Sequence, residues 1–328
     1  MRYYKPKDNH SIICLLCKHY CTIKEGKVGI CGVNQNSGGE LETLVYGYPS
    51  AMNIDPIEKK PLYHFLPNTK SFSIGTVGCN LRCPFCQNWE ISQTNIVDKT
   101  DYFSPKDIVD LALKYNSKSI SYTYNEPTIW YPYAKDIGLL AKEAGLKNIF
   151  VSSGFESSEV LEDMLSFVDA SNIDLKSFNK EYYKKVLKAD LDGVLATIKT
   201  LAKSGVHLEL TTLVIPDVND STDELKKMAE FIAQVDAKLP WHLSAFYPNY
   251  KLNDTKATPL KTLLKAKGIA KDAGLEYVYI GNITHDTNTY CPKCENLLIS
   301  RENYTSKIVG LSLDRCQKCN YTIKGVFL

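Results

Sequence analysis

The segment GCNLRCPFCQNW packs three cysteines into eight positions. Cys79, Cys83 and Cys86 follow the pattern C-x3-C-x2-C, and thiolates at this spacing can each bind one iron of a [4Fe-4S] cube. The fourth iron then has no protein ligand, so it can bind another molecule and act on it. The alternative is a zinc knuckle whose fourth ligand is a distant histidine, for example His64 or His242.

The chain has eleven cysteines, and the other eight form one quartet near each end of the sequence. The three groups account for every cysteine, so no fourth thiol is spare for the central loop. This count favours two closed metal sites and one open site. The two quartets are Cys14, Cys17, Cys21 and Cys31, and Cys291, Cys294, Cys316 and Cys319.

The second quartet consists of two knuckles, CPKC and CQKC, with 21 residues and β-rich segments between them. This arrangement is typical of a zinc ribbon, in which four thiolates close a tetrahedral structural site. Rubredoxin-like iron is the main alternative. Redox dithiols are disfavoured because neither pair lies in a βαβ context.

The first quartet has the spacing C-x2-C-x3-C-x9-C. Its thiolates could hold structural zinc or a closed auxiliary [4Fe-4S] cluster that relays electrons. We favour zinc, because the segment GKVGICG predicts a tight glycine turn that presents the last ligand, as in small zinc folds.

The composition is that of an ordinary soluble protein, with 44 % hydrophobic and 23 % charged residues among 328, enough for a large core. The formal net charge of +2 gives no overall field that would make nucleic acid or an anionic membrane an obligatory partner. We see no secretory apolar region before the first cysteines and no apolar run of membrane-spanning length. We therefore expect a cytoplasmic protein, where dense cysteines indicate metal.

Between about residues 71 and 282, short β-branched or apolar runs alternate with longer amphipathic ones. This alternation predicts an α/β fold of βα units around a parallel sheet, as a full or partial barrel or an open doubly wound sheet. Either form places chemistry at the carboxyl ends of the strands. Predicted strands cover residues 72–78, 119–124, 148–154, 170–176, 207–215, 241–248 and 276–282. Predicted helices cover residues 104–115, 129–146, 221–235 and 258–275.

Three domains are expected. Residues 1–70 lack the βα pattern and should form an N-terminal module that contains the first cysteine quartet and short strands. Residues 71–284 should form the βα domain, and residues 285–328 the zinc ribbon.

Cys79 directly follows the first predicted strand, and C-x3-C-x-F-C in that place resembles the cysteine loop of the radical S-adenosylmethionine (radical SAM) enzymes. The resemblance covers about residues 71–282 and implies a partial barrel of six βα units. It also implies that the open iron chelates SAM and that one electron from the reduced cluster cleaves SAM to methionine and a hydrogen-abstracting 5'-deoxyadenosyl radical. Phe85, beside the last thiolate, would help to exclude water from the cluster.

Two strand ends carry the main candidates for SAM contacts. Glu126, in YTYNEPT, stands where related enzymes carry a Gly-Gly-Glu-like turn, and would accept hydrogen bonds from the ammonium group of SAM. Asp174 and Lys176 share one face of a strand end. A similar Asp-Leu-Lys strand in the activases of glycyl-radical enzymes reaches SAM, with its lysine near the carboxylate. The plainer alternatives are a surface loop acid and an exposed ion pair.

Further candidates come from weaker matches to those activases. His242, in PWHLSAFYP, matches a Pro-aromatic-His whose histidine approaches the cofactor; the alternative is a core histidine bonded to the backbone. Asn88, in CQNW, takes the place of an asparagine in the CHN motif of the activases. Ser152 and Ser153 end the third strand, where ribose contacts are common in this fold.

The motifs IEKKPLYHFLP, NIDLKSF, LVIPDVNDS and PWHLSAFYP, with both quartets, resemble the radical SAM member of the AmmeMemoRadiSam system over nearly the whole chain. That group is related to pyruvate formate-lyase activating enzymes. The resemblance implies partners of the AMMECR and Memo families and a reducing electron donor of flavodoxin or ferredoxin type. Asn68 and Asp217 replace glycines of that group at loop positions, where Asn and Asp tolerate the turn geometry of glycine.

Three functions remain as hypotheses. The first is a radical SAM enzyme that abstracts hydrogen from an unidentified macromolecular or small-molecule target. The second is a glycyl-radical enzyme activase, which ranks lower because the two appended modules favour a different target. The third is a non-enzymatic, metal-stabilised scaffold that binds RNA or protein, for which the polar strand ends would have no explanation.

Overall fold

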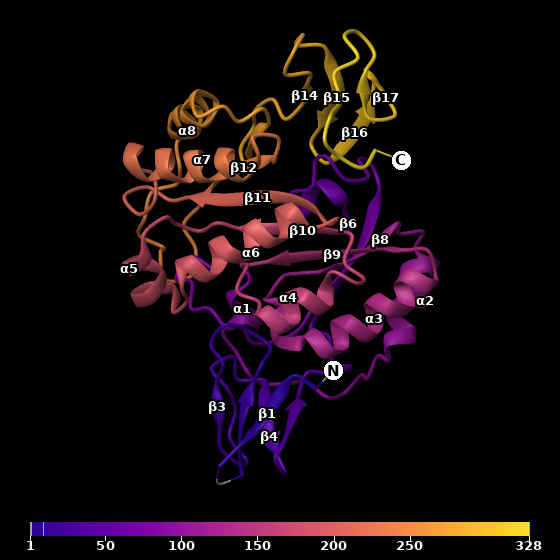
Figure 1. Cartoon of the computed structure of the whole chain (residues 1–328), viewed down its shortest axis with the longest axis vertical. Coiled ribbons are helices and arrows are strands. Elements are labelled where there is room, and N and C mark those ends of the chain that lie inside the picture. The colour runs from indigo at the N-terminus through magenta and orange to yellow at the C-terminus, as the bar shows by residue number, and fades with distance from the viewer. Residues whose placement is uncertain (1, 9, 328) are drawn as a thin grey trace.

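The computed structural model describes residues 2–8 and 10–327. Three parts follow one another along its longest axis (Figure 1): strands of the N-terminal residues at one end, a large sheet with helices in the middle, and strands of the C-terminal residues at the other end. Within the described residues, no helix has both the length and the apolar character needed to cross a membrane.

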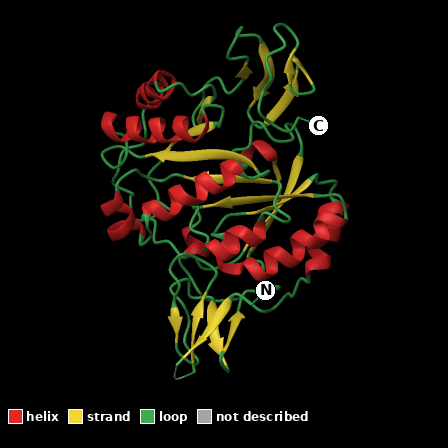
Figure 2. Ribbon diagram, viewed as in Figure 1, coloured by secondary structure: helices red, strands yellow, loops and turns green. Residues whose placement is uncertain are grey.

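An eight-stranded sheet forms the centre (Figure 2). Seven of its strands run parallel, and each lies beside its predecessor in the chain, as βα units require when each helix returns the chain to the same end of the sheet. All seven fall on predicted strands, so the predicted central parallel sheet is confirmed. They are β7 (Lys70–Gly75), β8 (Ser119–Tyr122), β9 (Lys147–Ser152), β10 (Ala170–Asp174), β11 (His207–Val214), β12 (Trp241–Ala245) and β13 (Val278–Gly281).

The eighth strand, β6 (Ala51–Pro56), pairs antiparallel with β7 and forms one edge of the sheet. It belongs to the segment that the sequence assigned to the N-terminal module. The central layer therefore begins earlier in the chain than the βα alternation indicates. The opposite edge is β13, and the described residues show no pairing between β13 and β6.

The helices connect successive parallel strands. Helix α2 begins at a capping box, because the Ser104 side chain accepts from the Asp107 amide while the Asp107 side chain accepts from the Ser104 amide. The four predicted helices correspond to α2, α3, α7 and α8, whereas α1, α4, α5 and α6 were not predicted. The helices are α1 (Trp89–Ser92), α2 (Pro105–Lys114), α3 (Tyr131–Glu143), α4 (Ser158–Met164), α5 (Lys180–Tyr182), α6 (Leu191–Lys203), α7 (Thr222–Asp236) and α8 (Leu260–Asp272). Short 3-10 turns cover Ile57–Lys59 and Pro127–Trp130, and a π turn covers Tyr183–Leu187.

The two faces of the sheet differ in chemistry. On β11, Leu208 and Leu210 belong to the large apolar core shared with the helices, whereas Glu209 between them faces the other way, by the two-residue period of a strand. At one end of this second face, residues 57–66 pack as a small apolar cluster against Ile149 and Ala170. The remaining interior of the second face carries polar groups, and it positions the candidate site.

The N-terminal residues form two small antiparallel units. Their strands are β1 (Tyr4–Lys7), β2 (Ser11–Cys14) and β3 (Thr22–Ile23), with the hairpin β4 (Asn34–Ser37) and β5 (Glu40–Thr43). The module docks on the loop after β9 through a β-bridge between Cys17 and Glu156 and a hydrogen bond from the Lys18 amide to the Phe155 carbonyl. The first quartet therefore lies against the central domain.

The C-terminal residues form a second small β module around the second quartet. Its strands are β14 (Thr289–Tyr290), β15 (Leu297–Glu302), β16 (Thr305–Ile308), β17 (Leu311–Ser312) and β18 (Arg315–Cys316). The tail beyond them forms a parallel bridge between Val326 and Phe65, so it pairs with the segment that covers the second face of the sheet.

Candidate active site

The three-cysteine loop follows β7 at the carboxyl end of the parallel strands. Gly78 has φ +87°, a conformation that favours glycine, and its amide donates to the Ile91 carbonyl. The Lys251 amide, from the segment after β12, donates to the Pro84 carbonyl at 3.0 Å. These two hydrogen bonds hold the loop from two sides. It lies after the first parallel strand, as the sequence predicts.

Donors approach two of the three loop thiols. The Leu81 amide donates to Cys79 Sγ at 3.4 Å, and Ser92 Oγ lies 3.1 Å from Cys86 Sγ. Burial raises the pKa of Cys83 to about 12, and the Lys176 ammonium opposes this shift. Hydrogen bonds to sulfur and a nearby cation stabilise thiolates bound to a cluster. Phe85 is buried, as expected of a residue that keeps water from the loop.

Asp174 and Lys176 lie beside the loop. Lys176 Nζ donates to Asp174 Oδ2 at 2.6 Å. Desolvation alone would lower the pKa of Lys176, but the charges of Asp174 and Cys83 outweigh it and raise the pKa. The Lys176 side chain is only 14 % exposed, whereas the Asp174 side chain is 36 % exposed, so the lysine is the shielded member of the pair.

Glu126 lies close to Cys79, but its carboxylate is filled by protein donors. Oε1 accepts from the Thr128 amide, Thr128 Oγ1 and Ser152 Oγ, and Oε2 accepts from both the amide and Oγ of Ser153. Five donors leave no free lone pair for the ammonium group of SAM. Contacts of Glu126 and Ser153 with SAM stay predictions; in the structure these residues bind each other.

Asn88 and His242 are both bonded within the protein. Asn88 Nδ2 donates to the Tyr124 carbonyl at 2.8 Å. His242 Nε2 lies 2.6 Å from Glu209 Oε2, and its ring stacks on Tyr279. His242 therefore has the surroundings of the core-histidine alternative, with a carboxylate in place of the backbone. Strand pairing puts it level with Asp174, two strands away.

Sequence reasoning missed Glu209, which is fully buried and accepts from the amides of Tyr63 and His64 as well as contacting His207 and His242. Desolvation would raise its pKa, but the two histidines hold the pKa well below the usual value of 4.5. A signal was present, because HLE at the start of β11 puts a histidine and a carboxylate on one face of a strand.

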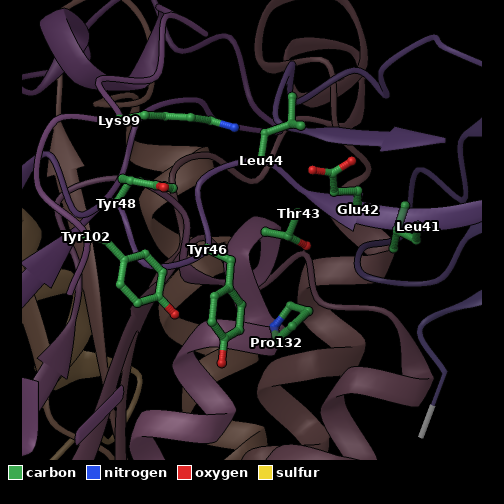
Figure 3. Close-up of a pocket in the computed structure, with 9 residues that line it drawn as sticks. All are labelled: Leu41, Glu42, Thr43, Leu44, Tyr46, Tyr48, Lys99, Tyr102 and Pro132. Carbon is green, nitrogen blue, oxygen red and sulfur yellow. The ribbon is translucent and has the colours of Figure 1, made fainter. Parts of the chain in front are cut away.

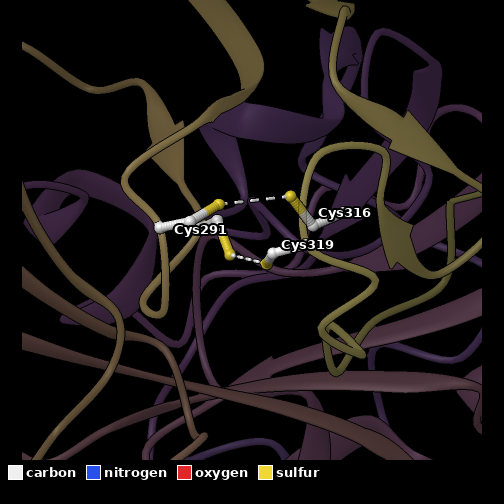
Figure 4. Close-up of side chains that lie close together, drawn as sticks. Cys291, Cys316 and Cys319 are labelled. Carbon is white, nitrogen blue, oxygen red and sulfur yellow. Dashed lines mark hydrogen bonds between the residues drawn. The ribbon is translucent and has the colours of Figure 1, made fainter.

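The central loop and the second quartet differ in the spacing of their thiols. Cys291 and Cys319 have sulfurs 3.5 Å apart, and Cys294 and Cys316 have sulfurs 3.7 Å apart (Figure 4). These values match the roughly 3.8 Å between sulfurs that a tetrahedral ion with Zn–S of about 2.3 Å requires. All four sulfurs of the second quartet lie within 4.8 Å of one another. Among the described residues, the three loop sulfurs do not form such a group, either alone or together with a histidine.

The thiols of the first quartet are neighbours at a wider spacing. The Cys14 amide donates to the Cys21 carbonyl. Burial, together with smaller contributions from Cys31 and Cys21, raises the pKa of the Cys14 thiol to about 12. All four thiols are among the described residues, yet no three of their sulfurs lie within 4.8 Å of one another. The metal of this quartet stays a prediction.

A pocket of about 460 Å³ lies away from the cysteine loop (Figure 3). Residues of β5 and of the segment that follows it line the pocket together with Lys99, Tyr102 and Pro132. No predicted site residue lines this pocket, so the pocket does not mark the candidate active site.

Comparison with known proteins decides the family. The model of the Radical SAM superfamily matches residues 73–232, a range that contains the three-cysteine loop, Glu126, Asp174 and Lys176. Residues 73–232 belong to the radical SAM superfamily. The chain is therefore an enzyme, and the non-enzymatic scaffold is set aside.

Two relatives show how far the likeness extends. An uncharacterized protein of Methanocaldococcus jannaschii is 42 % identical over 328 residues, which cover 98 % of this chain and 97 % of that one. The pyruvate formate-lyase 1-activating enzyme of Escherichia coli K12 is 23 % identical over 220 residues, 62 % of this chain and 89 % of the activase. The whole-chain relative thus shares the appended modules.

Solved structures support the radical SAM fold. A radical SAM methyltransferase from Sphaerobacter thermophilus has a TM-score of 0.52 at 13 % identity, covering 66 % of this chain and 67 % of that chain. Streptococcus suis SuiB bound to S-adenosylmethionine has a TM-score of 0.50 at 11 % identity, covering 69 % of this chain and 53 % of SuiB. At these identities only the fold is shared.

The site of this radical SAM protein fits the cofactors of its superfamily, a [4Fe-4S] cluster and SAM. The loop thiols are spread, as expected when each binds a different iron. Asn172 Oδ1 and Thr211 Oγ1 are buried acceptors without a partner in the described residues. Both share a sheet face with Asp174, since Asn172 precedes it by two residues and Thr211 pairs with it. A bound polar molecule would satisfy these acceptors.

Proposed function

We propose that the chain reductively cleaves SAM and abstracts a hydrogen atom from a target molecule. The observation that carries this proposal is the placement of Cys79, Cys83 and Cys86 after β7, with the Lys176–Asp174 pair beside Cys83. When bound, the cluster and SAM supply a 5'-deoxyadenosyl radical. A thiolate in place of the missing fourth ligand would block this chemistry, and the chain has none spare.

The chain's own residues hold and orient the cofactors. Leu81 N–H and Ser92 Oγ would bond to cluster-bound sulfur, and Lys176 would offset the negative charge of the cluster and attract the SAM carboxylate. Asp174, 36 % exposed, keeps acceptor capacity for the SAM ammonium group. Glu126 fixes the turn at Ser152 and Ser153, because it binds donors from both.

The test is anaerobic reconstitution with iron and sulfide, followed by SAM and dithionite. The expected product is 5'-deoxyadenosine, measured by chromatography with mass detection. A chain that takes up no iron and forms no 5'-deoxyadenosine would refute the proposal. Comparison of protein and RNA from cells with and without the chain, by mass spectrometry, then searches for the target.

A glycyl-radical enzyme activase is the second candidate. Its support is the similarity to the pyruvate formate-lyase 1-activating enzyme, which covers 62 % of this chain. The modules outside that match favour another target. Incubation with each glycyl-radical enzyme of the host should give a glycyl-radical EPR signal if the activase hypothesis holds, and silence from all of them would eliminate it.

We also propose membership of the AmmeMemoRadiSam group, a cytoplasmic location and zinc in the second quartet. The sulfur distances of 3.5 and 3.7 Å support one tetrahedral ion there. Elemental analysis should find zinc in the purified chain, and the Cys79→Ala variant should contain the same amount of zinc. Affinity capture with AMMECR- and Memo-family proteins tests the proposed partners. The proposed electron donor is tested by using reduced flavodoxin or ferredoxin in place of dithionite in the SAM-cleavage assay.

A further inference from the structure

We propose that Cys14, Cys17, Cys21 and Cys31 hold a second, closed [4Fe-4S] cluster, which delivers electrons to the cluster site at Cys79, Cys83 and Cys86. The inference rests on the proposed function of the three-cysteine loop. It revises the zinc prediction that the spacing of the first quartet favoured.

The spacing of the thiols distinguishes a site for a cluster from a site for a single ion. The second quartet shows how this chain arranges four thiols around a single ion, with all four sulfurs within 4.8 Å. In the first quartet no three sulfurs meet that limit, although all four residues are described and adjacent in the module. Four thiolates that each bind a different iron of a cube stand farther apart than four that share one ion. The spacing therefore favours a cluster.

The first quartet lies against the three-cysteine loop. A Cβ built on Gly78 would lie 2.8 Å from the carbonyl oxygen of Cys31, so the backbone of Cys31 touches the residue that precedes Cys79. Arg82 joins the same segments, because Nη2 donates to the Ile30 carbonyl at 2.6 Å and Nη1 donates to the Cys79 carbonyl at 2.7 Å. The backbone that carries the first quartet therefore contacts the backbone of the three-cysteine loop.

The Asn80 side chain lies between the loop and the first quartet. Asn80 is fully buried, follows Cys79 directly, and its carbonyl lies 2.9 Å from His19 Nε2. Its side chain also approaches the Cys17 thiol. Asn80 Nδ2 has no partner of ordinary hydrogen-bond geometry among the described residues. A buried amide donor without an acceptor, beside a cysteine, is suited to donate to a sulfur of a bound cluster.

The electron balance is simple. A one-electron donor of flavodoxin or ferredoxin class is oxidised, and the first-quartet cluster passes from its 2+ to its 1+ state. The same electron then moves to the cluster at the loop, which passes from 2+ to 1+, and the first quartet returns to 2+. No bond forms or breaks at the first quartet, and no proton is transferred there.

The decisive experiment counts iron in two matched variants of the full chain, each reconstituted anaerobically with iron and sulfide. Removing the loop thiols together (Cys79→Ala, Cys83→Ala, Cys86→Ala) should leave about four irons and four sulfides per chain, with a [4Fe-4S] EPR signal after reduction. Cys17→Ser with Cys31→Ser should lower the wild-type content from about eight irons to about four. Cys291→Ser with Cys294→Ser is the control and should keep all the iron.

A second measurement tests delivery. In the Cys17→Ser, Cys31→Ser variant, 5'-deoxyadenosine formation driven by reduced flavodoxin should fall much more than formation driven by dithionite, which reaches the loop directly. An equal fall with both reductants would refute the relay. Iron near zero in the loop variant, with zinc equal to two per chain, would refute the cluster. Absence of 5'-deoxyadenosine from the wild type would instead refute the proposed function, because the iron count of the loop variant is independent of it.

Discussion

The two quartets contain the same ligands and differ in almost everything around them. The sulfurs of the C-terminal quartet are gathered within 4.8 Å, in a small module with its own apolar cluster around Leu298 and Ile299. The N-terminal quartet is spread more widely, and Cys14 belongs to the main core of the protein together with Cys83 of the loop. The comparison teaches that four cysteines define a metal site, whereas sulfur spacing and neighbouring residues indicate what the metal does.

The largest effect should come from the three-cysteine loop, which belongs to neither quartet. Cys83→Ala removes one of three thiolates from an open cluster site, and 5'-deoxyadenosine formation should fall to background because the cluster no longer has a ligand for each of three irons. Zinc content should stay at the wild-type value, since the second quartet lies in the separate C-terminal β module. Measurable SAM cleavage by the variant would break the distinction between open and closed sites.

The next effect separates structural from redox sites. Cys316→Ser should release the zinc proposed for the C-terminal quartet, and structural zinc in small peptides contributes on the order of 10 kcal/mol or more of apparent binding free energy. Hydrogen exchange of β15 and β16 should therefore become fast, while iron content stays constant. Loss of iron together with zinc would show that the two modules are not independent.

A smaller effect tests how the segment at Tyr63 and His64 is fixed to the sheet. Glu209→Gln leaves His207, His242 and two backbone amides without their carboxylate, and should lower the free energy of unfolding by about 3 to 5 kcal/mol. Glu143→Gln, at an exposed position of α3, should change it by less than about 0.5 kcal/mol. Urea unfolding of both variants at neutral pH makes the comparison.

The same carboxylate predicts the direction of acid sensitivity. Because its folded pKa lies below the usual value of 4.5, ionised Glu209 contributes stability above that value, and the contribution is lost as the pH falls through the folded pKa. The stability difference between wild type and Glu209→Gln should therefore shrink on acidification below about pH 4.3. A difference that grows with acid would contradict this account.

The smallest effect lies outside all three cysteine groups. Asn68 has φ +63°, so Asn68→Gly should be nearly neutral, whereas Asn68→Ala should cost about 1 kcal/mol. Thermal unfolding measures both. Metal content should remain the same in each variant, which makes this pair a baseline for the cysteine changes.

Much of the fold could be predicted from local pattern. The seven parallel strands follow from apolar runs between turn residues, and the left-handed φ of Asn68 and Asp217 agrees with the glycines expected there. Helix α6 was missed because Gly193 and its β-branched residues weaken the helical signal. Strand β6 was missed because an edge strand of mixed character, AMNIDP, carries little periodicity.

The site was predictable only where neighbours in sequence act together. Asp174 and Lys176 share a strand, so their pairing follows from the period of two. The pairing of His242 with Glu209 depends on the register between β11 and β12, which no local pattern fixes. The filling of the Glu126 carboxylate depends likewise on Ser152 and Ser153 from the neighbouring strand, and could be found only in three dimensions.

The bridge between Phe65 and Val326 has a consequence for the order of folding. His64 bonds through Nδ1 to the carbonyl of Lys324, 260 residues later. Closing so long a loop is entropically costly and tends to be slow. During synthesis, the segment around Phe65 must wait for the last residues before its backbone is paired. We therefore expect the nascent chain to form its parallel sheet first and to dock this segment in a separate, late step.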